Sequence, residues 1–173
     1  MSWCLVFPGQ GSQAVGMLTD LATEPAGAAV IAEADEALGF ALSSLMNEGP
    51  AETLTLTENA QPALLTVSIA VWRVLKARGL SPAAPITHMA GHSLGEFSAL
   101  TAAGVLSFAD AVRLVRLRGQ AMQSAVPVGE GGMAAVLGLE MDVIADVART
   151  AAAETGAVCV AANDNAPGQV VIR

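Results

Sequence analysis

The chain has 173 residues, of which 53% are hydrophobic, and a formal net charge of −8 at pH 7. This length suits one domain with a small second lobe, and the negative charge argues against a nucleic-acid partner, because nucleic-acid phosphates favour a basic surface. No apolar run approaches the ~18 residues that suggest a membrane span, so we expect a cytoplasmic protein with no membrane partner.

An apolar strand is predicted at 3–7, and a loop with the sequence Phe-Pro-Gly-Gln-Gly-Ser-Gln follows at 7–13. The segment before Pro8 lacks the basic region of a signal peptide, so we expect none. Parallel sheets carry their ligand loops at the carboxyl ends of strands. The backbone N–H of Gln10 is therefore a candidate oxyanion donor. A phosphate-binding loop is the rival interpretation, but the third glycine of a dinucleotide loop and the lysine of a P-loop are absent.

The most informative segment is Gly-His-Ser-Leu-Gly at 91–95, which has the G-x-S-x-G spacing of a nucleophile elbow. An apolar strand is predicted before it, at 86–90, and a helix after it, at 94–103, closed by a glycine. The two glycines of the motif leave room for a tight strand-to-helix turn. The pattern makes Ser93 the candidate nucleophile and the backbone N–H of Leu94 a second oxyanion donor.

A serine hydroxyl needs a base to become a good nucleophile. The chain has two histidines, His88 and His92. The first lies on the incoming strand, and the turn should direct the second away from the hydroxyl. In hydrolases with this elbow the base follows the serine, yet no histidine occurs from 94 to 173. Either the base lies outside this sequence or the elbow is not catalytic, and we expect backbone hydrogen bonds to satisfy both histidines.

The pattern from 108 to 125 predicts a helix with Ser107 as its N-cap. Arg113 and Arg116 lie on a polar stripe that we expect to face solvent; the alternative is a basic patch at the mouth of the site. Arg118 instead shares its side with Leu114, Val115, Ala121 and Met122. Its guanidinium would then need an anion near the core, supplied by a structural ion pair or by a carboxylate-bearing substrate, unless the side chain extends to solvent.

Earlier helices are predicted near 33–38 and 61–78, and the glycine-rich segment 126–132 predicts a hinge. Beyond it the pattern predicts a strand at 133–139, a helix at 142–154, a strand at 157–162, a turn at 163–168 and a strand from 169. This βαββ order is the opening of a ferredoxin-like lobe. Cys4 and Cys159 lie in apolar, strand-like runs, which predict neither a disulfide nor a metal site.

Three motifs resemble the malonyl-CoA:acyl carrier protein transacylase family: the loop at 7–13, the elbow at 91–96 and Leu-Arg-Gly at 117–119. They occur in the family's order and at its intervals, and the segments 58–64 and 163–172 resemble it as well. The resemblance implies an α/β fold. A hydrolase-like, parallel-sheet large domain would begin at 1–126, and an inserted ferredoxin-like small lobe would begin at 127–173, both incomplete in this chain.

The resemblance also implies an acyltransferase that moves a malonyl group from coenzyme A to the phosphopantetheine thiol of acyl carrier protein, in fatty acid biosynthesis. Ser93 would carry malonate as an ester, the backbone of Gln10 and Leu94 would form the oxyanion hole, and Arg118 would bind the free carboxylate. Gln61 would be a structural or pocket-lining residue without a chemical role. The expected partners are acyl carrier protein and the coenzyme A thioester, with malonyl-CoA as substrate and no cofactor or metal.

The sequence departs from the family at one point. The family's catalytic histidine lies beyond the segment 163–172, so the 173 residues alone are expected to be inactive. Two other functions remain open. The first is an esterase or thioesterase with the same elbow, which would not need the Arg118 cation, and the second is a noncatalytic fragment or carrier-binding module.

Overall fold

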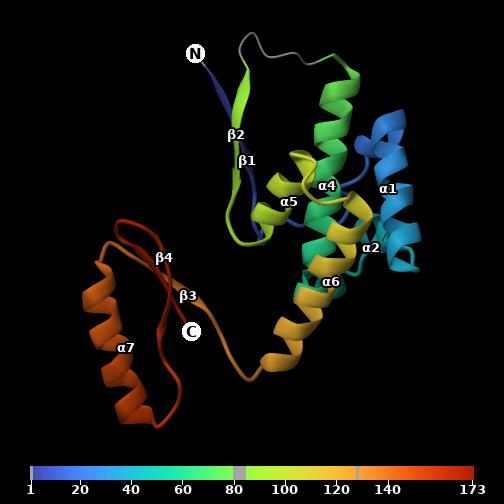
Figure 1. Ribbon diagram of the computed structural model, residues 1–173. Helices are drawn as coiled ribbons and strands as arrows, with labels where there is room; N and C mark the ends of the chain where they lie inside the picture. Colours follow the sequence, from blue (N-terminus) through green and yellow to red (C-terminus); the bar gives the residue numbers. More distant parts are fainter. Residues whose placement is uncertain (1, 80–84, 128) are drawn as a thin grey trace. The chain divides into compact units, whose positions relative to one another are not determined.

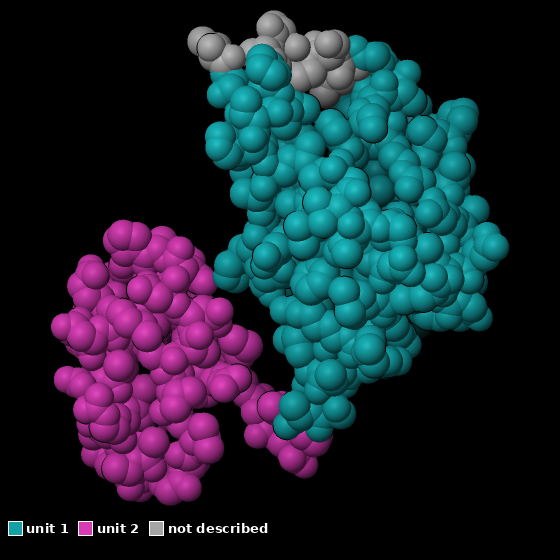
Figure 2. All heavy atoms as spheres, viewed as in Figure 1, with its two compact units in different colours: residues 1–125 teal, residues 126–173 magenta. Residues whose placement is uncertain are grey.

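The computed structural model describes residues 2–79, 85–127 and 129–173 and is α/β, as predicted (Figure 1). The chain forms two compact units, residues 1–125 and 126–173 (Figure 2). Val128, inside the predicted hinge, lies outside the described residues. Among the helices of the described ranges, none has the length and apolar character needed to cross a membrane.

The first unit contains, in chain order, β1 (Trp3–Phe7), the short 3-10 helix η1 (Leu21–Thr23), α1 (Pro25–Leu38), α2 (Leu42–Glu48), α3 (Ala51–Thr55), α4 (Thr57–Ala77), β2 (Ile86–Gly91), α5 (Leu94–Ala102) and α6 (Phe108–Ala125). β1 and β2 pair in parallel, with Phe7 opposite Gly91. Both strands therefore end at the same edge of the sheet, and the loop after β1 emerges beside the elbow after β2.

Helix α4 is the central helix of this unit and packs against α1, α5 and α6 (Figure 1). Nearly all its residues from 59 to 70 are buried, which is the pattern of a helix surrounded by other elements. Leu65 and Ile69 pack in one apolar cluster with Val112 and Val115 of α6. Each such side chain contributes about 1.5–3 kcal/mol through burial, so this cluster fixes α6 against α4.

Helix α4 begins at Thr57, four residues before the predicted start. Pro62, which would be the second residue of the predicted helix, therefore lies in the interior of the observed one. A proline has no N–H, and an interior proline therefore leaves the carbonyl four residues earlier without its helical donor. The carbonyl of Glu58 is the one affected. The fold thus presents a backbone acceptor in the first turn of α4 that lacks its ordinary helical donor.

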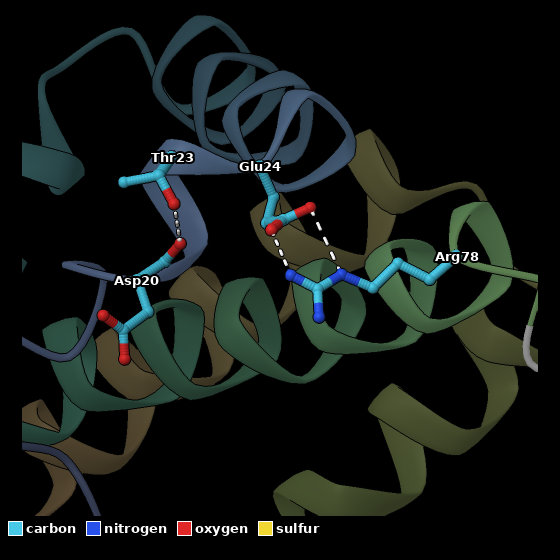
Figure 3. A network of polar contacts seen from close by, with 4 residues as sticks. All are labelled: Asp20, Thr23, Glu24 and Arg78. Atoms are coloured by element: carbon cyan, nitrogen blue, oxygen red, sulfur yellow. Dashed lines mark hydrogen bonds and ion pairs between the residues drawn. The ribbon is translucent and has the colours of Figure 1, made fainter.

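An ion pair joins the start of α1 to the end of α4 (Figure 3). Glu24 precedes α1, and its carboxylate accepts hydrogen bonds from Nη2 and Nε of Arg78, the latter at 3.5 Å. The hydrogen bond from Arg78 is the main cause that lowers the pKa of the Glu24 carboxyl below its ordinary value. Both groups lie at the surface, so solvent screens the pair and its contribution to stability is small.

We expect Glu24→Gln to lower the melting temperature slightly near neutral pH and to have no effect in acid. Because the folded-state pKa of Glu24 is lowered, its contribution is present above the unfolded pKa and is lost as the pH falls through the folded pKa. Melting curves of both proteins between about pH 7 and pH 3 test this. Asp20→Asn is the matched control, since that carboxylate makes no contact in the network of Figure 3. A Glu24→Gln difference that did not change with pH would contradict the prediction.

The second unit contains β3 (Ala134–Leu137), α7 (Met141–Thr155), β4 (Ala161–Ala166) and β5 (Gln169–Ile172). Strand β5 lies between β3 and β4 and is antiparallel to both, which is the split arrangement that a ferredoxin-like βαββ order produces. Helix α7 packs on this sheet. Ile144 and Ala148 of the helix are buried, as is Val170 of β5.

The predicted positions of β4 and of the turn after it were wrong. The strand lies at 161–166 rather than 157–162, and the turn is the two-residue segment 167–168 rather than 163–168. Pro167 and Gly168, the latter at φ 72°, supply the turn. The asparagines before them, which are common turn residues, instead lie within the strand: Asn163 pairs with Val171 of β5, and Asn165 lies at an irregularity of the register.

Candidate active site

Ser93 stands on a sharp turn between β2 and α5. Among the described residues it is the only one other than glycine with a positive φ, at 53°. A Cβ on Gly91 would lie 2.1 Å from the carbonyl carbon and oxygen of Gly95, and a Cβ on Gly95 would lie 2.3 Å from the carbonyl oxygen of Phe7. Both glycines are therefore required sterically, as predicted, and the strained serine is exposed at the end of the sheet.

The loop after β1 lies against this elbow. A Cβ on Gly9 would lie 3.2 Å from the carbonyl oxygen of His92. The next residue, Gln10, is held to the start of α4, where its Nε2 donates to Thr57 Oγ1 at 3.3 Å. Leu94 is the first residue of α5, so its backbone N–H is one of the four that a helix cannot bond internally. The oxyanion role of Gln10 and Leu94 remains a prediction.

Arg118 joins three elements at the site. From α6, its Nη2 donates to Ser93 Oγ at 2.9 Å and its Nη1 donates to Gln61 Oε1, on α4, at 2.5 Å. The guanidinium carbon lies 5.8 Å from the ring centroid of Phe97, on α5. Within the described residues no carboxylate lies within ion-pair distance of Arg118, so its partners are neutral groups and a structural ion pair does not hold it.

The premise that placed Arg118 on the buried face of α6 was partly wrong. Leu114 and Met122, which share its side of the helix, are each 44% exposed. The buried face of α6 consists instead of Phe108, Ala111, Val112, Val115 and Gly119. Arg118 lies at the edge of this face and is half-buried, which allows its stem to pack while its guanidinium reaches the serine.

Gln61, for which the sequence predicts a structural or pocket-lining role, holds the guanidinium of Arg118. The side chain is completely buried; its Oε1 accepts from Arg118, and its Nε2 donates to Met122 Sδ at 3.4 Å. The amide is thereby fixed with its oxygen toward the guanidinium. The available signal was an amide at the start of an apolar helical run, because a buried amide must find hydrogen-bond partners.

Arg113 is exposed, as predicted for the polar stripe of α6, whereas Arg116 is not. Arg113 Nε donates at 2.9 Å to the carbonyl of Ala37, in the last turn of α1, where a cation is favourable. Arg116 is half-buried, and its Nη1 donates at 3.0 Å to the Glu58 carbonyl. The solvent-face prediction is therefore confirmed for Arg113 and wrong for Arg116, whose side chain binds the first turn of α4.

Neither histidine activates the serine in the described part of the chain. The Nδ1 of His88 lies 2.9 Å from Thr87 Oγ1, a side-chain partner rather than the backbone one predicted, and His92 is exposed. No hydrogen bond joins either imidazole to the hydroxyl of Ser93 among the described residues. The location of the base outside this sequence remains a prediction. The described ranges also hold no group of three or more His, Cys, Asp or Glu side chains placed to bind a metal ion.

The sequence matches the acyl transferase domain family over residues 4–173. It is 52% identical over 171 residues to the malonyl CoA-acyl carrier protein transacylase of Haemophilus influenzae, a match that covers 98% of this chain and 54% of the relative. The chain thus spans about half the length of the curated relatives it matches.

Solved structures agree with the sequence comparison. The acyl-carrier-protein-S-malonyltransferase of Bartonella henselae superposes with a TM-score of 0.89 at 50% identity, covering 99% of this chain and 55% of that one. A malonyl-transacylase solved in complex with its type II polyketide synthase acyl-carrier protein superposes with a TM-score of 0.88 at 47% identity, covering 99% and 54%. These matches confirm the resemblance found in the motifs.

Proposed function

Because the chain belongs to the acyl transferase domain family, we propose that the protein that carries it moves a malonyl group from coenzyme A to the phosphopantetheine thiol of acyl carrier protein, through an ester on Ser93, in fatty acid biosynthesis. The match to transacylases that are named for malonyl-CoA and acyl carrier protein supports the substrates. A relative solved with its acyl-carrier protein supports the partner.

The proposed reaction has two halves. In the first, a base takes the hydroxyl proton as Ser93 Oγ attacks the thioester carbonyl, and the carbonyl oxygen becomes an oxyanion beside the backbone N–H groups of Gln10 and Leu94. The carbon–sulfur bond then breaks, and coenzyme A leaves as the thiol with that proton. In the second, the phosphopantetheine thiol attacks the seryl ester and Ser93 leaves as the alcohol. The N-terminus of α5 begins at Leu94, and its dipole favours negative charge at this point.

The observation that carries the proposal is the hydrogen bond from Arg118 to Ser93 Oγ at 2.9 Å. A malonyl ester on this oxygen would bring its free carboxylate within reach of the same guanidinium, which can bind two carboxylate oxygens at once. An acyl group without a carboxylate would leave the cation without a charged partner. This argues for malonate transfer over the esterase and thioesterase alternatives, which have no use for a cation at the nucleophile.

We further propose that the protein acts in the cytoplasm and that the reaction uses malonyl-CoA as substrate with no cofactor or metal. The steps above involve only a hydroxyl, backbone N–H groups, a guanidinium and a base. The noncatalytic alternative is less well supported, because a binding module would not need a strained serine with its hydroxyl held by an arginine.

The proposal is tested by trapping the ester. Brief incubation of the full-length protein with labelled malonyl-CoA should place one malonyl group on the peptide that contains Ser93, as read by mass mapping. Subsequent addition of phosphopantetheinylated acyl carrier protein should transfer the label to the carrier. Labelled acetyl-CoA is the matched control and should acylate Ser93 far less. Label on another residue, or equal labelling by both thioesters, would contradict the proposal.

A further inference from the structure

A second arginine of α6 occupies the backbone acceptor that Pro62 leaves free. The carbonyl of Glu58 lies four residues before the proline and has no helical donor. Arg116 Nη1 donates to this carbonyl at 3.0 Å. Because an unpaired, partly buried carbonyl is unfavourable, the proline creates a fixed attachment point for α6 on the first turn of α4.

Three further contacts hold the same guanidinium. Arg116 Nη1 also donates to Asn59 Oδ1, Nη2 lies 3.6 Å from the Glu58 carboxylate, and the guanidinium carbon lies 4.9 Å from the ring centroid of Phe40. Asn59 is 5% exposed and is itself fixed, since its Nδ2 donates to the carbonyl of Thr53 at 2.8 Å. We call these four contacts of Arg116 the Arg116 clamp.

Arg116 and Arg118 lie on either side of a close contact that Gly119 of α6 makes with α4. A Cβ on Gly119 would lie 2.6 Å from the Cα of Glu58 and 2.7 Å from the carbonyl oxygen of Thr57. At 100° per residue, Arg116 lies on one side of Gly119 around the helix and Arg118 on the other. The first binds α4 at residues 58 and 59, and the second binds it at Gln61.

We infer that Arg116 is a positioning residue for Arg118. The Arg116 clamp, which includes the Glu58 carbonyl that Pro62 leaves without a helical donor, sets the rotation and register of α6 against α4. It thereby holds the Arg118 guanidinium between Gln61 and Ser93. This inference deepens the proposed function and rests on it. Without the clamp, α6 still packs on α4 through its apolar face, but its rotation is less narrowly set and the guanidinium of Arg118 loses its fixed direction. Selectivity for an acyl group with a carboxylate then falls.

The test is Arg116→Met in the full-length protein, which keeps most of the side-chain length and removes every donor. We expect kcat/KM for malonyl-CoA to fall about tenfold, a middle value for residues coupled through one network, while the low kcat/KM for acetyl-CoA stays within about twofold. Arg113→Met is the matched control on the same helix and should change neither value. Arg116→Lys should give an intermediate loss, because one ammonium cannot reproduce the planar guanidinium fork.

A second variant tests the physical cause. In Pro62→Ala the new N–H can bond the Glu58 carbonyl within the helix, so that carbonyl depends less on Arg116. Adding Arg116→Met to Pro62→Ala should therefore cost less malonyl transfer than Arg116→Met costs alone. Equal costs in the two backgrounds would overturn the part of the inference that concerns the proline.

A chemical readout keeps the inference testable without turnover. A dicarbonyl reagent that modifies arginine, followed by mass mapping, should modify Arg118 severalfold faster in Arg116→Met than in the unaltered protein, and at the unaltered rate in Arg113→Met. An unchanged rate at Arg118, or equal losses of malonyl and acetyl transfer, would overturn the inference. An unaltered protein that transfers no malonate, with the labelling difference intact, would overturn the proposed function and leave the positioning role standing.

Discussion

Replacing Ser93 with alanine in the full-length protein is expected to lower the rate of malonyl transfer about 10⁴-fold or more, the scale seen when a nucleophilic serine is removed from other enzymes. The alanine variant cannot form the ester, and the remaining machinery can only orient the donor thioester and the acceptor thiol. The loss should appear in kcat, as measured with malonyl-CoA and acyl carrier protein, because the chemical step is what the substitution removes.

Ser98 provides the matched control for Ser93. It lies on the same helix, α5, is 1% exposed, and its hydroxyl has no hydrogen-bond partner within the described residues. Ser98→Ala removes a buried unsatisfied polar group, so it should leave stability unchanged or slightly raised and transfer intact. Retention of normal transfer by Ser93→Ala would show that the elbow does not carry the acyl group.

Replacing Arg118 with alanine is expected to reduce malonyl transfer about 30-fold or more while acetyl transfer is kept or increased. Removal of one partner of a hydrogen-bonded charge pair costs ~2–5 kcal/mol, and the half-buried position of Arg118 places the effect toward the lower end of that range. Acetate has no carboxylate left to bind, so it loses nothing when the cation is removed. The ratio of kcat/KM for the two thioesters measures the effect.

Arg118→Lys separates charge from geometry. The lysine keeps a positive charge but cannot donate to Gln61 and Ser93 together as the guanidinium does, so it should recover only part of the malonyl preference. Equal losses of malonyl and acetyl transfer in Arg118→Ala would mean that the arginine supports the fold of the site rather than the choice of acyl group.

The elbow around Ser93 could be predicted because its geometry depends only on residues that are close together in the sequence. Ser93 at positive φ needs a glycine on either side within a strand-to-helix turn, and the sequence shows both. The N-cap Ser107 was equally readable: its Oγ accepts from the backbone N–H of Asp110 at 3.1 Å. Such features depend on a few consecutive dihedral angles, so composition and spacing reveal them.

The parts that could not be predicted depend on contacts between distant elements. The polar stripe that contains Arg113 and Arg116 has the periodicity of a solvent face, and only the approach of α1 and α4 shows that both arginines also bind carbonyls at helix ends. Gln61 has no role until α6 brings Arg118 and Met122 to it. The turn after β4 was misplaced for the opposite reason: several turn-forming residues stand together there, and strand pairing decides which of them bend.

The polar contacts of the site also determine when it can exist during folding. Gln10 reaches Thr57 across 47 residues, Arg118 reaches Gln61 across 57, and Arg116 reaches Glu58 across 58. Closing each of these long loops costs chain entropy, so these contacts form only when the elements that carry them come together. The elbow can therefore turn locally at an early stage, but Arg118 reaches Gln61 and Ser93 only when α4 and α6 have docked.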